Sequence, residues 1–319
     1  MAAPAIPAHD PATGLNAVSV ATAVERAARI GVVGVGAMGM AMARNLHAKG
    51  WHLSTRDVRA EADDEARAAG FDVCASSRAL AAQTDIVVIV VLNAQQIDDV
   101  LFGAAGVVDA TDGPVAGAKT VMLCSTIAPQ DAIHIAARLA QYGIATIDAP
   151  ISGGPARALA GTMSAMLAAP VTTLERWRPL LADLAEKRFV VSACVGDATK
   201  AKLVNNLLAG INLVAGAEAL ALAGKLGLDP AAMFEIIRAS SGASWVFEDR
   251  MARALAEDYS PPRAAAHILT KDLGLATALA ASVDHATPLG DAALARFHDM
   301  LARGWAALDD AAVIKTYQA

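Results

Sequence analysis

The sequence predicts an α/β fold in which a doubly wound sheet in the N-terminal part is followed by an all-α C-terminal domain. From Arg29 onward, short runs rich in Val, Ile and Leu alternate with alanine-rich helical stretches, which is the pattern of a parallel sheet covered by helices. After Val195 this rhythm stops and long helical stretches replace it. A chain of 319 residues also exceeds what one hydrophobic core usually organises, so two domains are expected.

Seven apolar runs are the expected strands. Four are nearly continuous in Val, Ile and Leu and should be buried, namely residues 30–35, 85–92, 120–124 and 145–148. A weaker run covers 51–56, and the runs 163–169 and 188–192 would extend the sheet. In the C-terminal part, helical elements are expected to begin near Thr199, Pro230, Ala264 and Leu289 and to form a compact bundle.

The change of pattern places the domain boundary near Gly196. Residues 29–196 then form the sheet domain and residues 197–319 the helical domain. Residues 1–28 contain several prolines and no basic start before an apolar run. We therefore expect a flexible extension there rather than a secretory signal.

Composition and charge exclude several classes of protein. A formal charge of −6 and 4% aromatic residues provide neither the basic surface nor the stacking side chains that nucleic-acid binding needs. Much of the 55% hydrophobic content is alanine, and the most apolar stretch, 203–224, carries Asn205, Asn206, Asn212 and Glu218, so it predicts an interior helix rather than a membrane span. The three cysteines and the dispersed histidines have no metal-ligand spacing, which predicts a protein without a metal. An odd number of scattered cysteines is typical of reduced thiols, so we expect the protein in the cytoplasm.

A glycine-rich turn follows the first expected strand and directly precedes a helix. Its sequence is G-V-G-A-M-G, with Gly34, Gly36, Ala37, Met38 and Gly39 as the expected contacts to a cofactor. The first glycine permits the tight turn, the second lets the backbone approach a pyrophosphate, and the third packs helix on strand. Because the helix also offers unpaired N–H groups to the anion, the turn predicts a Rossmann-type dinucleotide-binding domain over residues 29–196. A turn without a ligand is the alternative.

Asp57 ends the second expected strand, 18 positions after Gly39. A carboxylate there can accept hydrogen bonds from the adenosine ribose hydroxyls and repels a 2′-phosphate, which favours NAD over NADP. Arg56 and Arg59 flank Asp57 and could partly offset that repulsion, so NADP stays possible. An ordinary solvated turn residue is the alternative interpretation of Asp57.

Residues 148–162, D-A-P-I-S-G-G-P-A-R-A-L-A-G-T, resemble the substrate-loop signature of the β-hydroxyacid dehydrogenases, a family that includes 3-hydroxyisobutyrate dehydrogenase and tartronate semialdehyde reductase. The glycine-rich turn and residues 124–127, 202–206 and 271–272 extend the resemblance over nearly everything after Arg29. Within the family, residues 92–96, 244–250 and 309–315 are similar to the L-threonate dehydrogenase branch. Many relatives carry a proline where Asn93 stands, so the branch is a hypothesis that rests on few residues.

The resemblance implies that Lys202 is the catalytic acid/base and that Asn206 and Lys271 bind substrate. Asn206 lies one helical turn after Lys202, so both side chains should project from the same helix face. A free lysine is a poor base at neutral pH, so desolvation or a nearby positive charge, for which Lys271 is the candidate, must lower its pKa. Lys200 should point elsewhere. A solvated surface charge is the alternative for Lys202.

The remaining site residues are expected in loops at the sheet edge. Ser152, Gly153 and Gly154 resemble the loop that binds the substrate carboxylate, because glycines leave backbone N–H groups accessible to an anion; a tight turn is the alternative. The expected contacts to the cofactor, besides Lys271, are Leu92, Asn93, Gln96, Ser125 and Thr126. Loop hydrogen bonding (Asn93, Gln96) or capping of the helix at Pro129 (Ser125, Thr126) are the alternatives.

The glycine-rich turn and the family resemblance together imply an NAD-dependent dehydrogenase that oxidises a small hydroxy-carboxylate, with L-threonate as the best candidate. 3-Hydroxyisobutyrate dehydrogenase and tartronate semialdehyde reductase are the alternatives within the family. A dinucleotide-binding redox sensor or scaffold is the non-enzymatic alternative, since a Rossmann fold alone does not establish chemistry. The long apolar helix and the family resemblance imply a homodimer or homotetramer formed through the helical domain.

Overall fold

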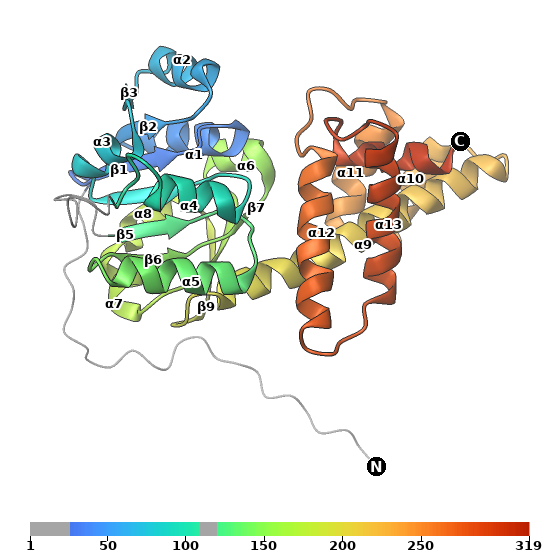
Figure 1. Cartoon of the computed structure of the whole chain (residues 1–319). Coiled ribbons are helices and arrows are strands. Elements are labelled where there is room, and N and C mark those ends of the chain that lie inside the picture. Colours follow the sequence, from blue (N-terminus) through green and yellow to red (C-terminus); the bar gives the residue numbers. More distant parts are fainter. Residues whose placement is uncertain (1–25, 109–119, 319) are drawn as a thin grey trace.

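The computed structural model describes residues 26–108 and 120–318, which form two lobes joined by one long helix (Figure 1). The blue-to-green lobe contains a sheet between layers of helices, and the yellow-to-red lobe is helical. The predicted combination of an α/β domain and an all-α domain is thus confirmed. The predicted flexible extension, 1–28, lies almost wholly outside the described residues.

Nine strands of the described residues form one sheet. They are β1 (Arg29–Val33), β2 (His52–Arg56), β3 (Asp72–Val73), β4 (Ile86–Ile89), β5 (Thr120–Leu123), β6 (Ala145–Asp148), β7 (Ile151–Ser152), β8 (Ser164–Ala168) and β9 (Lys187–Ser192). The order is β3-β2-β1-β4-β5-β6-β8-β7, with β9 paired to β8. The first six strands in this order pair in parallel, and the direction of pairing reverses at the junction of β6 and β8.

Two predicted strands end earlier than expected, for identifiable reasons. The strand predicted over 30–35 ends at Val33 because Gly34 adopts a φ of +89°, which turns the chain out of the sheet. The strand predicted over 85–92 ends at Ile89. There the backbone N–H groups of Val91 and Leu92 donate to side chains at 3.0 and 2.8 Å instead of to the ladder.

Helices cover both faces of the sheet (Figure 1). The helices of this lobe are α1 (Ala37–Ala48), α2 (Ala60–Ala68), α3 (Ser77–Ala82), α4 (Ala94–Phe102), α5 (Pro129–Ala140), α6 (Gly154–Ala160), α7 (Val171–Arg176) and α8 (Arg178–Leu184). Residues of α1, α2 and α6–α8 share one apolar cluster with one sheet face, and residues of α3–α5 share a second cluster with the other. Two hydrophobic layers therefore enclose the strands, as a doubly wound fold requires.

The second lobe packs around the long helix. Its helices are α9 (Asp197–Lys225), α10 (Pro230–Arg238), α11 (Trp245–Leu255), α12 (Ala266–Ala281), α13 (Pro288–Ala302) and the 3₁₀ helix η1 (Asp310–Tyr317). Asp229 and Ser244 cap α10 and α11, because their side chains accept hydrogen bonds from first-turn N–H groups. The sequence reading missed α11 as a separate helix, although Ser244 supplies a cap signal.

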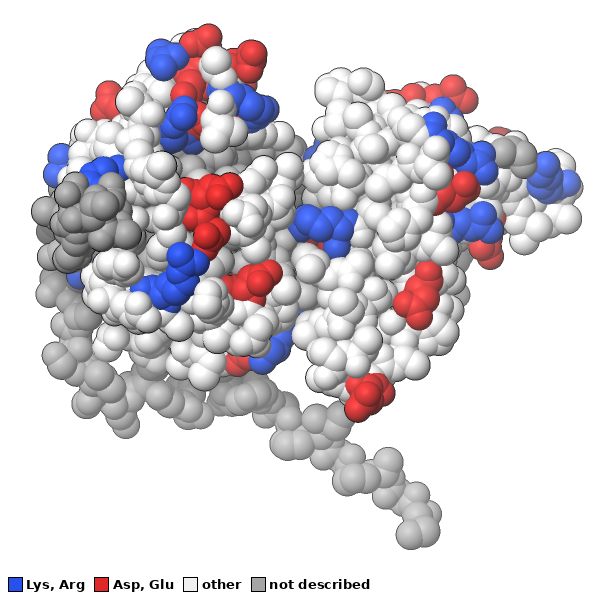
Figure 2. Space-filling view, viewed as in Figure 1, with Lys and Arg blue, Asp and Glu red and all other residues white. Residues whose placement is uncertain are grey.

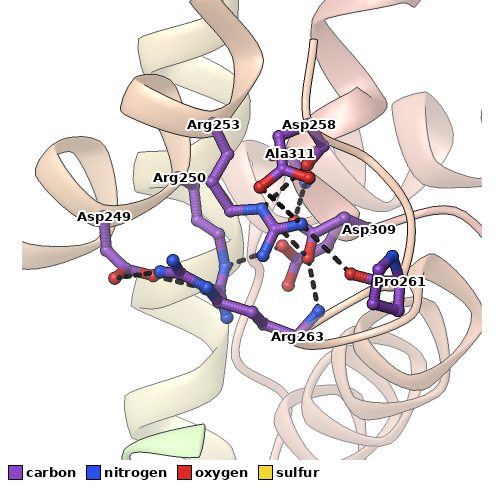
Figure 3. A network of polar contacts seen from close by, with 9 residues as sticks. Asp249, Arg250, Arg253, Asp258, Pro261, Arg263, Asp309 and Ala311 are labelled. Carbon is purple, nitrogen blue, oxygen red and sulfur yellow. Dashed lines mark hydrogen bonds and ion pairs between the residues drawn. The ribbon is translucent and has the colours of Figure 1, made fainter. Parts of the chain in front are cut away.

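A buried ionic network joins α11 to the C-terminal segment (Figure 3). Arg250 Nε lies 2.7 Å from Asp310 Oδ1, and Arg253 Nε lies 3.7 Å from Asp309 Oδ2. Asp309 also accepts a hydrogen bond from the backbone N–H of Arg263 at 2.8 Å. The motifs at 244–250 and 309–315, which suggested a branch of the family, therefore contact each other inside the helical lobe.

Helix α9 is only partly interior. Among the described residues it alone is long and apolar enough to cross a membrane, with 39% of its most apolar window buried. It packs against strands of the first lobe and against every helix of the second. Val204, Leu208 and Leu222 are more than half exposed, so the expected interior position holds for one side of the helix only.

Candidate active site

The glycine-rich turn between β1 and α1 has the tight geometry that its sequence predicted. Gly34 has a positive φ, and a Cβ there would lie 2.4 Å from the Val90 carbonyl oxygen. A Cβ on Gly39 would lie 1.9 Å from the Gly34 carbonyl oxygen. Both glycines are therefore required by the fold itself, with or without a ligand.

Gly36 is different, because nothing in the protein crowds it. A Cβ on Gly36 would meet only the Arg59 guanidinium, at 3.5 Å. Gly36 is also the N-cap of α1, with no side-chain cap and no acidic residue in the first turn, where Ala37 and Met38 lie. The N–H groups at this helix start are thus available to an anion, and the space over Gly36 fits a pyrophosphate.

Asp57 lies at the end of β2, as expected, and is almost fully buried. Its Oδ1 accepts hydrogen bonds from the Arg59 backbone N–H at 3.0 Å and from Arg59 Nε at 3.1 Å, and its Oδ2 accepts from Arg59 Nη2 at 3.2 Å. Burial acts to raise the pKa of Asp57, but the hydrogen bonds and charge of Arg59 outweigh it and the net pKa is lowered. Asp57 is therefore an anion held by Arg59, and a solvated turn residue is the wrong description.

The loops after β4 and β5 are cross-linked by polar side chains. Asn93 caps α4 by accepting from the Gln96 N–H at 2.9 Å, and Gln96 Oε1 accepts from the N–H of Leu92 at 2.8 Å. Ser125 Oγ accepts from the Val91 N–H at 3.0 Å. Asn93 and Gln96 thus make the loop hydrogen bonds that were the alternative to cofactor contact, and their role toward a cofactor stays a prediction.

The two glycines of the signature loop differ in their surroundings, because a Cβ on Gly153 would lie 3.2 Å from Arg157 and Met163, whereas Gly154 is open. Gly153 and Gly154 have φ values of +138° and +73°, and a Cβ on Gly154 would have no neighbour within 4 Å. Ser152 is half-buried in β7, where its carbonyl oxygen accepts a hydrogen bond from Ser164 at 3.3 Å. A tight turn is present, and the binding of an anion by its N–H groups stays a prediction.

Asp148, the first residue of the signature, anchors the start of α9. Its Oδ2 accepts from the N–H groups of Gly196 at 2.8 Å and Thr199 at 3.0 Å, and its Oδ1 accepts from Thr199 Oγ1 at 2.7 Å. The last residue of β6 therefore holds the first turn of α9 against the sheet. Sequence reasoning missed this role, although a carboxylate at a strand end is a ready cap for a helix N-terminus.

Lys202 lies one turn further along α9 and is buried, with 6% of its surface exposed. Asn206 is buried beside it, and Asn206 Nδ2 donates to Asp272 Oδ2 at 2.7 Å. Lys271 Nζ donates to Asp272 Oδ1 at 2.7 Å and to the Thr126 carbonyl oxygen at 2.6 Å. The structure thus brings four predicted residues, Lys202, Asn206, Lys271 and Thr126, into one polar cluster that bridges the two lobes.

The surroundings of Lys202 lower its pKa, as a role as a base requires. Burial, with a smaller contribution from the positive charge of Lys271, lowers the pKa of Lys202 to about 8, while the negative charge of Asp272 acts to raise it. Lys200 is exposed and pairs with Asp197 at 2.7 Å, as its direction on the helix predicted. The solvated-charge alternative for Lys202 is therefore wrong.

Asp272 is the second residue that sequence reasoning missed. Its two oxygens hold Asn206 and Lys271 at the same time, and its charge acts on the pKa of Lys202. The signal was its position directly after Lys271. Figure 2 shows a furrow between the lobes, with basic side chains at its helical margin, and the Lys271–Thr126 hydrogen bond crosses from one lobe to the other.

Comparison with known proteins decides the family. Residues 29–196 match the model of the NAD-binding domain of 6-phosphogluconate dehydrogenase, and residues 196–317 match the model described as NAD-binding of NADP-dependent 3-hydroxyisobutyrate dehydrogenase. The chain belongs to the β-hydroxyacid dehydrogenase family.

Relatives within the β-hydroxyacid dehydrogenase family span almost the whole chain. An L-threonate dehydrogenase from Cupriavidus necator is 38% identical over 288 residues, which are 90% of this chain and 95% of the relative. A crystal structure of 3-hydroxyisobutyrate dehydrogenase from Salmonella typhimurium is 35% identical, covers 90% of this chain and 99% of its own, and has a TM-score of 0.81. A 25% identical structure in complex with NADP⁺ covers 90% of this chain and 99% of its own, with a TM-score of 0.78. The cofactor of this β-hydroxyacid dehydrogenase is NAD(P).

Proposed function

We propose that this enzyme oxidises L-threonate, at the carbon beside its carboxylate, to the 2-oxo acid with NAD as the hydride acceptor. The observation that carries the proposal is the buried Lys202 with its pKa lowered to about 8, next to Asn206 and Lys271. The L-threonate dehydrogenase relative at 38% identity supports this substrate.

In the proposed mechanism, Lys202 is the general acid/base. Its neutral amine accepts the proton of the substrate hydroxyl during oxidation and returns it to the developing alkoxide in the reverse direction. The dinucleotide, when bound by the turn at 34–39 and Asp57, would supply the acceptor for the hydride of the carbon that carries the hydroxyl. Asn206 lies one helical turn after Lys202, and its side chain is held by Asp272 of α12. Its amide is therefore fixed in a position to orient the same hydroxyl.

The other predicted site residues divide between the two ligands. Ser152, Gly153 and Gly154 bind the substrate carboxylate, and Lys271 neutralises charge where substrate and nicotinamide meet. Binding of the dinucleotide falls to the phosphate turn at 34–39 and to Asp57, with contacts from Leu92, Asn93, Gln96, Ser125 and Thr126. The positive charge of Lys271 can thereby attract a substrate that carries a carboxylate.

The test is NADH formation by the full chain with L-threonate, other four-carbon sugar acids, 3-hydroxyisobutyrate and glycerate. We expect the highest kcat/KM with L-threonate. Activity confined to 3-hydroxyisobutyrate or glycerate would reject the threonate assignment and favour the other family members. Tight binding of dinucleotide without turnover of any acid would instead support a redox sensor or scaffold.

The proposal extends to the organisation and location of the enzyme. Residues 29–196 form the NAD-binding domain and 197–319 the helical domain that binds substrate and associates with other copies as a homodimer or homotetramer. The exposed Val204, Leu208 and Leu222 of α9 support such an interface. We place the enzyme in the cytoplasm, acting on a small hydroxy-carboxylate without a metal, a nucleic acid or a membrane.

A further inference from the structure

Arg157 holds the signature loop together from within. It belongs to α6, which lies between β7 and β8 on the side of the first lobe that faces the helical lobe (Figure 1). Its Nε and Nη2 donate to the carbonyl oxygen of Thr162 at 3.1 and 2.8 Å. The N–H of Thr162 donates back to the Arg157 carbonyl oxygen at 2.9 Å. One side chain therefore fastens the segment that returns from α6 to β8.

The stem of Arg157 packs against the turn at Gly153. A Cβ on Gly153 would lie 3.2 Å from Cβ and Cδ of Arg157 and 3.2 Å from Met163 Cβ. Because Thr162 directly precedes Met163, the guanidinium that is bonded to Thr162 also lies close to this turn. Arg157 thus supports the turn with its stem and places a positive charge beside it.

The charge of Arg157 has no acidic partner among the described residues, although the side chain is half-buried. Other half-buried or buried arginines pair with an aspartate, namely Arg56 with Asp63, Arg138 with Asp98, Arg250 with Asp310 and Arg253 with Asp258. A partly buried cation without a counter-ion is unfavourable. An anionic ligand would supply the missing counter-ion.

The charged groups at the far end of α6 do not neutralise Arg157. Lys49 lies beside Gly161, and Glu186 donates its backbone N–H to the Gly161 carbonyl oxygen at 3.0 Å. Lys49 is 3.9 Å from Asp183, which it pairs with. Neither Asp183 nor Glu186 forms an ion pair with Arg157 in the part of the chain that the structure describes. The positive charge therefore stays available on the side of the turn.

Arg157 is separate from the place of the dinucleotide. Pro155, Ala156 and Leu159 of α6 line the cavity beside Gly36. These three positions share one side of the helix, and Arg157 projects from the other side. A change at Arg157 should therefore leave the binding of NAD⁺ intact.

We propose that Arg157 is a specificity-determining residue for acidic substrates. Its stem keeps the turn Ser152–Gly154 in shape, and its unpaired charge attracts the carboxylate that this turn receives. The inference rests on the proposed function for the role of the turn. It adds a cation outside the Lys202 cluster as the reason why an acid is preferred to an uncharged alcohol of the same shape.

Direct binding of acids and of their uncharged counterparts tests this role. Isothermal titration of the full chain with bound NADH measures the dissociation constants of L-threonate and 3-hydroxyisobutyrate. The counterparts are L-threitol and 2-methyl-1,3-propanediol, in which a hydroxymethyl group replaces the carboxylate. Arg157→Gln keeps a stem beside Gly153 and a donor for Thr162 but removes the charge. It should weaken the acid that the wild type binds by about five- to fifty-fold, with the uncharged counterpart and NAD⁺ unchanged.

Turnover gives a second readout. In Arg157→Gln the KM of the acid should rise by the same factor while kcat is kept, because Lys202 and the place of the dinucleotide are untouched. Arg157→Lys restores the charge without the two hydrogen bonds to one oxygen and should recover part of the lost affinity.

Arg178→Gln is the matched control, because it removes the same charge from the same lobe. Arg178 is exposed and pairs with Glu175 at 3.4 Å in the segment that leads into α8, so acid binding should stay at the wild-type level. Thermal melts establish that each variant is folded. If Arg157→Gln does not fold, Arg157→Met serves as the second variant without charge.

Each result decides. Acid affinity that is unchanged in Arg157→Gln, or that falls equally in Arg178→Gln, overturns the inference while the proposed function stands. An equal loss for an acid and its uncharged counterpart also overturns it, because the side chain would then act through shape alone. Wild-type protein that binds NADH but no acid overturns both. A loss confined to the acids, and partly recovered in Arg157→Lys, supports the inference.

Discussion

Replacing Lys202 by arginine removes the base and keeps the positive charge. With its pKa lowered to about 8, Lys202 is neutral in about one molecule in ten at pH 7, against about one in three thousand for a lysine at 10.5. Burial therefore supplies roughly a 300-fold larger population of the form that accepts a proton. A guanidinium stays protonated at any practical pH, so Lys202→Arg should lose about 10²- to 10⁴-fold in turnover.

The assay is kcat/KM for oxidation between pH 5.5 and 10. For the wild type it should rise about tenfold per pH unit and level off near pH 8, because the neutral amine is the active form. Reduction of the oxo acid should show the opposite limb, since it requires the protonated amine. Lys200→Arg, an exposed change on the same helix, should leave both profiles intact. Wild-type turnover in Lys202→Arg, or a limb that persists there, would refute the role of Lys202.

The same burial has a measurable consequence for stability. A lysine whose folded pKa is lowered costs stability below that pKa, and the cost disappears as pH rises from about 8 toward 10.5. Lys202→Met should therefore raise the free energy of unfolding at pH 7 by on the order of 3 kcal/mol, and the gain should fade above pH 8. Chemical denaturation at pH 7 and pH 10 measures the difference in free energy of unfolding between Lys202→Met and the wild type. This difference would be the same at pH 7 and pH 10 if the charge of Lys202 were well solvated.

Two further predictions concern the phosphate turn and the buried carboxylates. Gly36→Ala should keep the fold and weaken dinucleotide binding, whereas Gly39→Ala should lower the melting temperature, because of these two glycines only Gly39 would bring a Cβ into collision with backbone. Thermal melts and titration with NAD⁺ separate the two. Burial raises the pKa of Asp310 to about 7 despite its pairing with Arg250. Between about pH 4 and pH 7 the folded state therefore keeps a proton on Asp310 that the unfolded chain has lost. Stability should fall as pH rises from about 4 to 7, and Asp310→Asn should remove up to about 4 kcal/mol of that decline in denaturation curves. An unchanged slope in the variant would contradict the buried-acid assignment.

The sheet was predictable because its strands have a local signature. The run 145–148 was identified to the residue, since three apolar or β-branched positions end at the carboxylate of Asp148. The run 85–92 was predicted too long, because Val91 and Leu92 are as apolar as the strand, but their N–H groups donate to the side chains of Ser125 in another loop and of Gln96 in α4. The hydrophobicity of a residue indicates that it is buried, but it does not show which group accepts the hydrogen bond of its backbone N–H. The end of a strand therefore cannot be predicted from hydrophobicity alone.

The site was predictable where the residues form a motif, and not where they act through a distant partner. The glycine-rich turn was predicted from its own spacing between strand and helix, and the role of Lys202 was predicted from the resemblance to the family. The roles of Asp148 and Asp272 depend on contacts across 51 and 66 positions, which no spacing rule reveals. The same holds for Arg250 and Asp310, whose motifs suggested a substrate branch and form a buried ion pair in the helical lobe.

The anchoring of α9 by Asp148 determines which parts of the machinery travel together. Because the first turn of α9 is fastened to the edge of the sheet, Lys202 is rigidly attached to the lobe that carries the dinucleotide site. Lys271 belongs to the other lobe and reaches across through Thr126. We therefore expect a movement of the helical lobe to change the distance between Lys271 and Thr126, whereas Lys202 stays beside the sheet lobe.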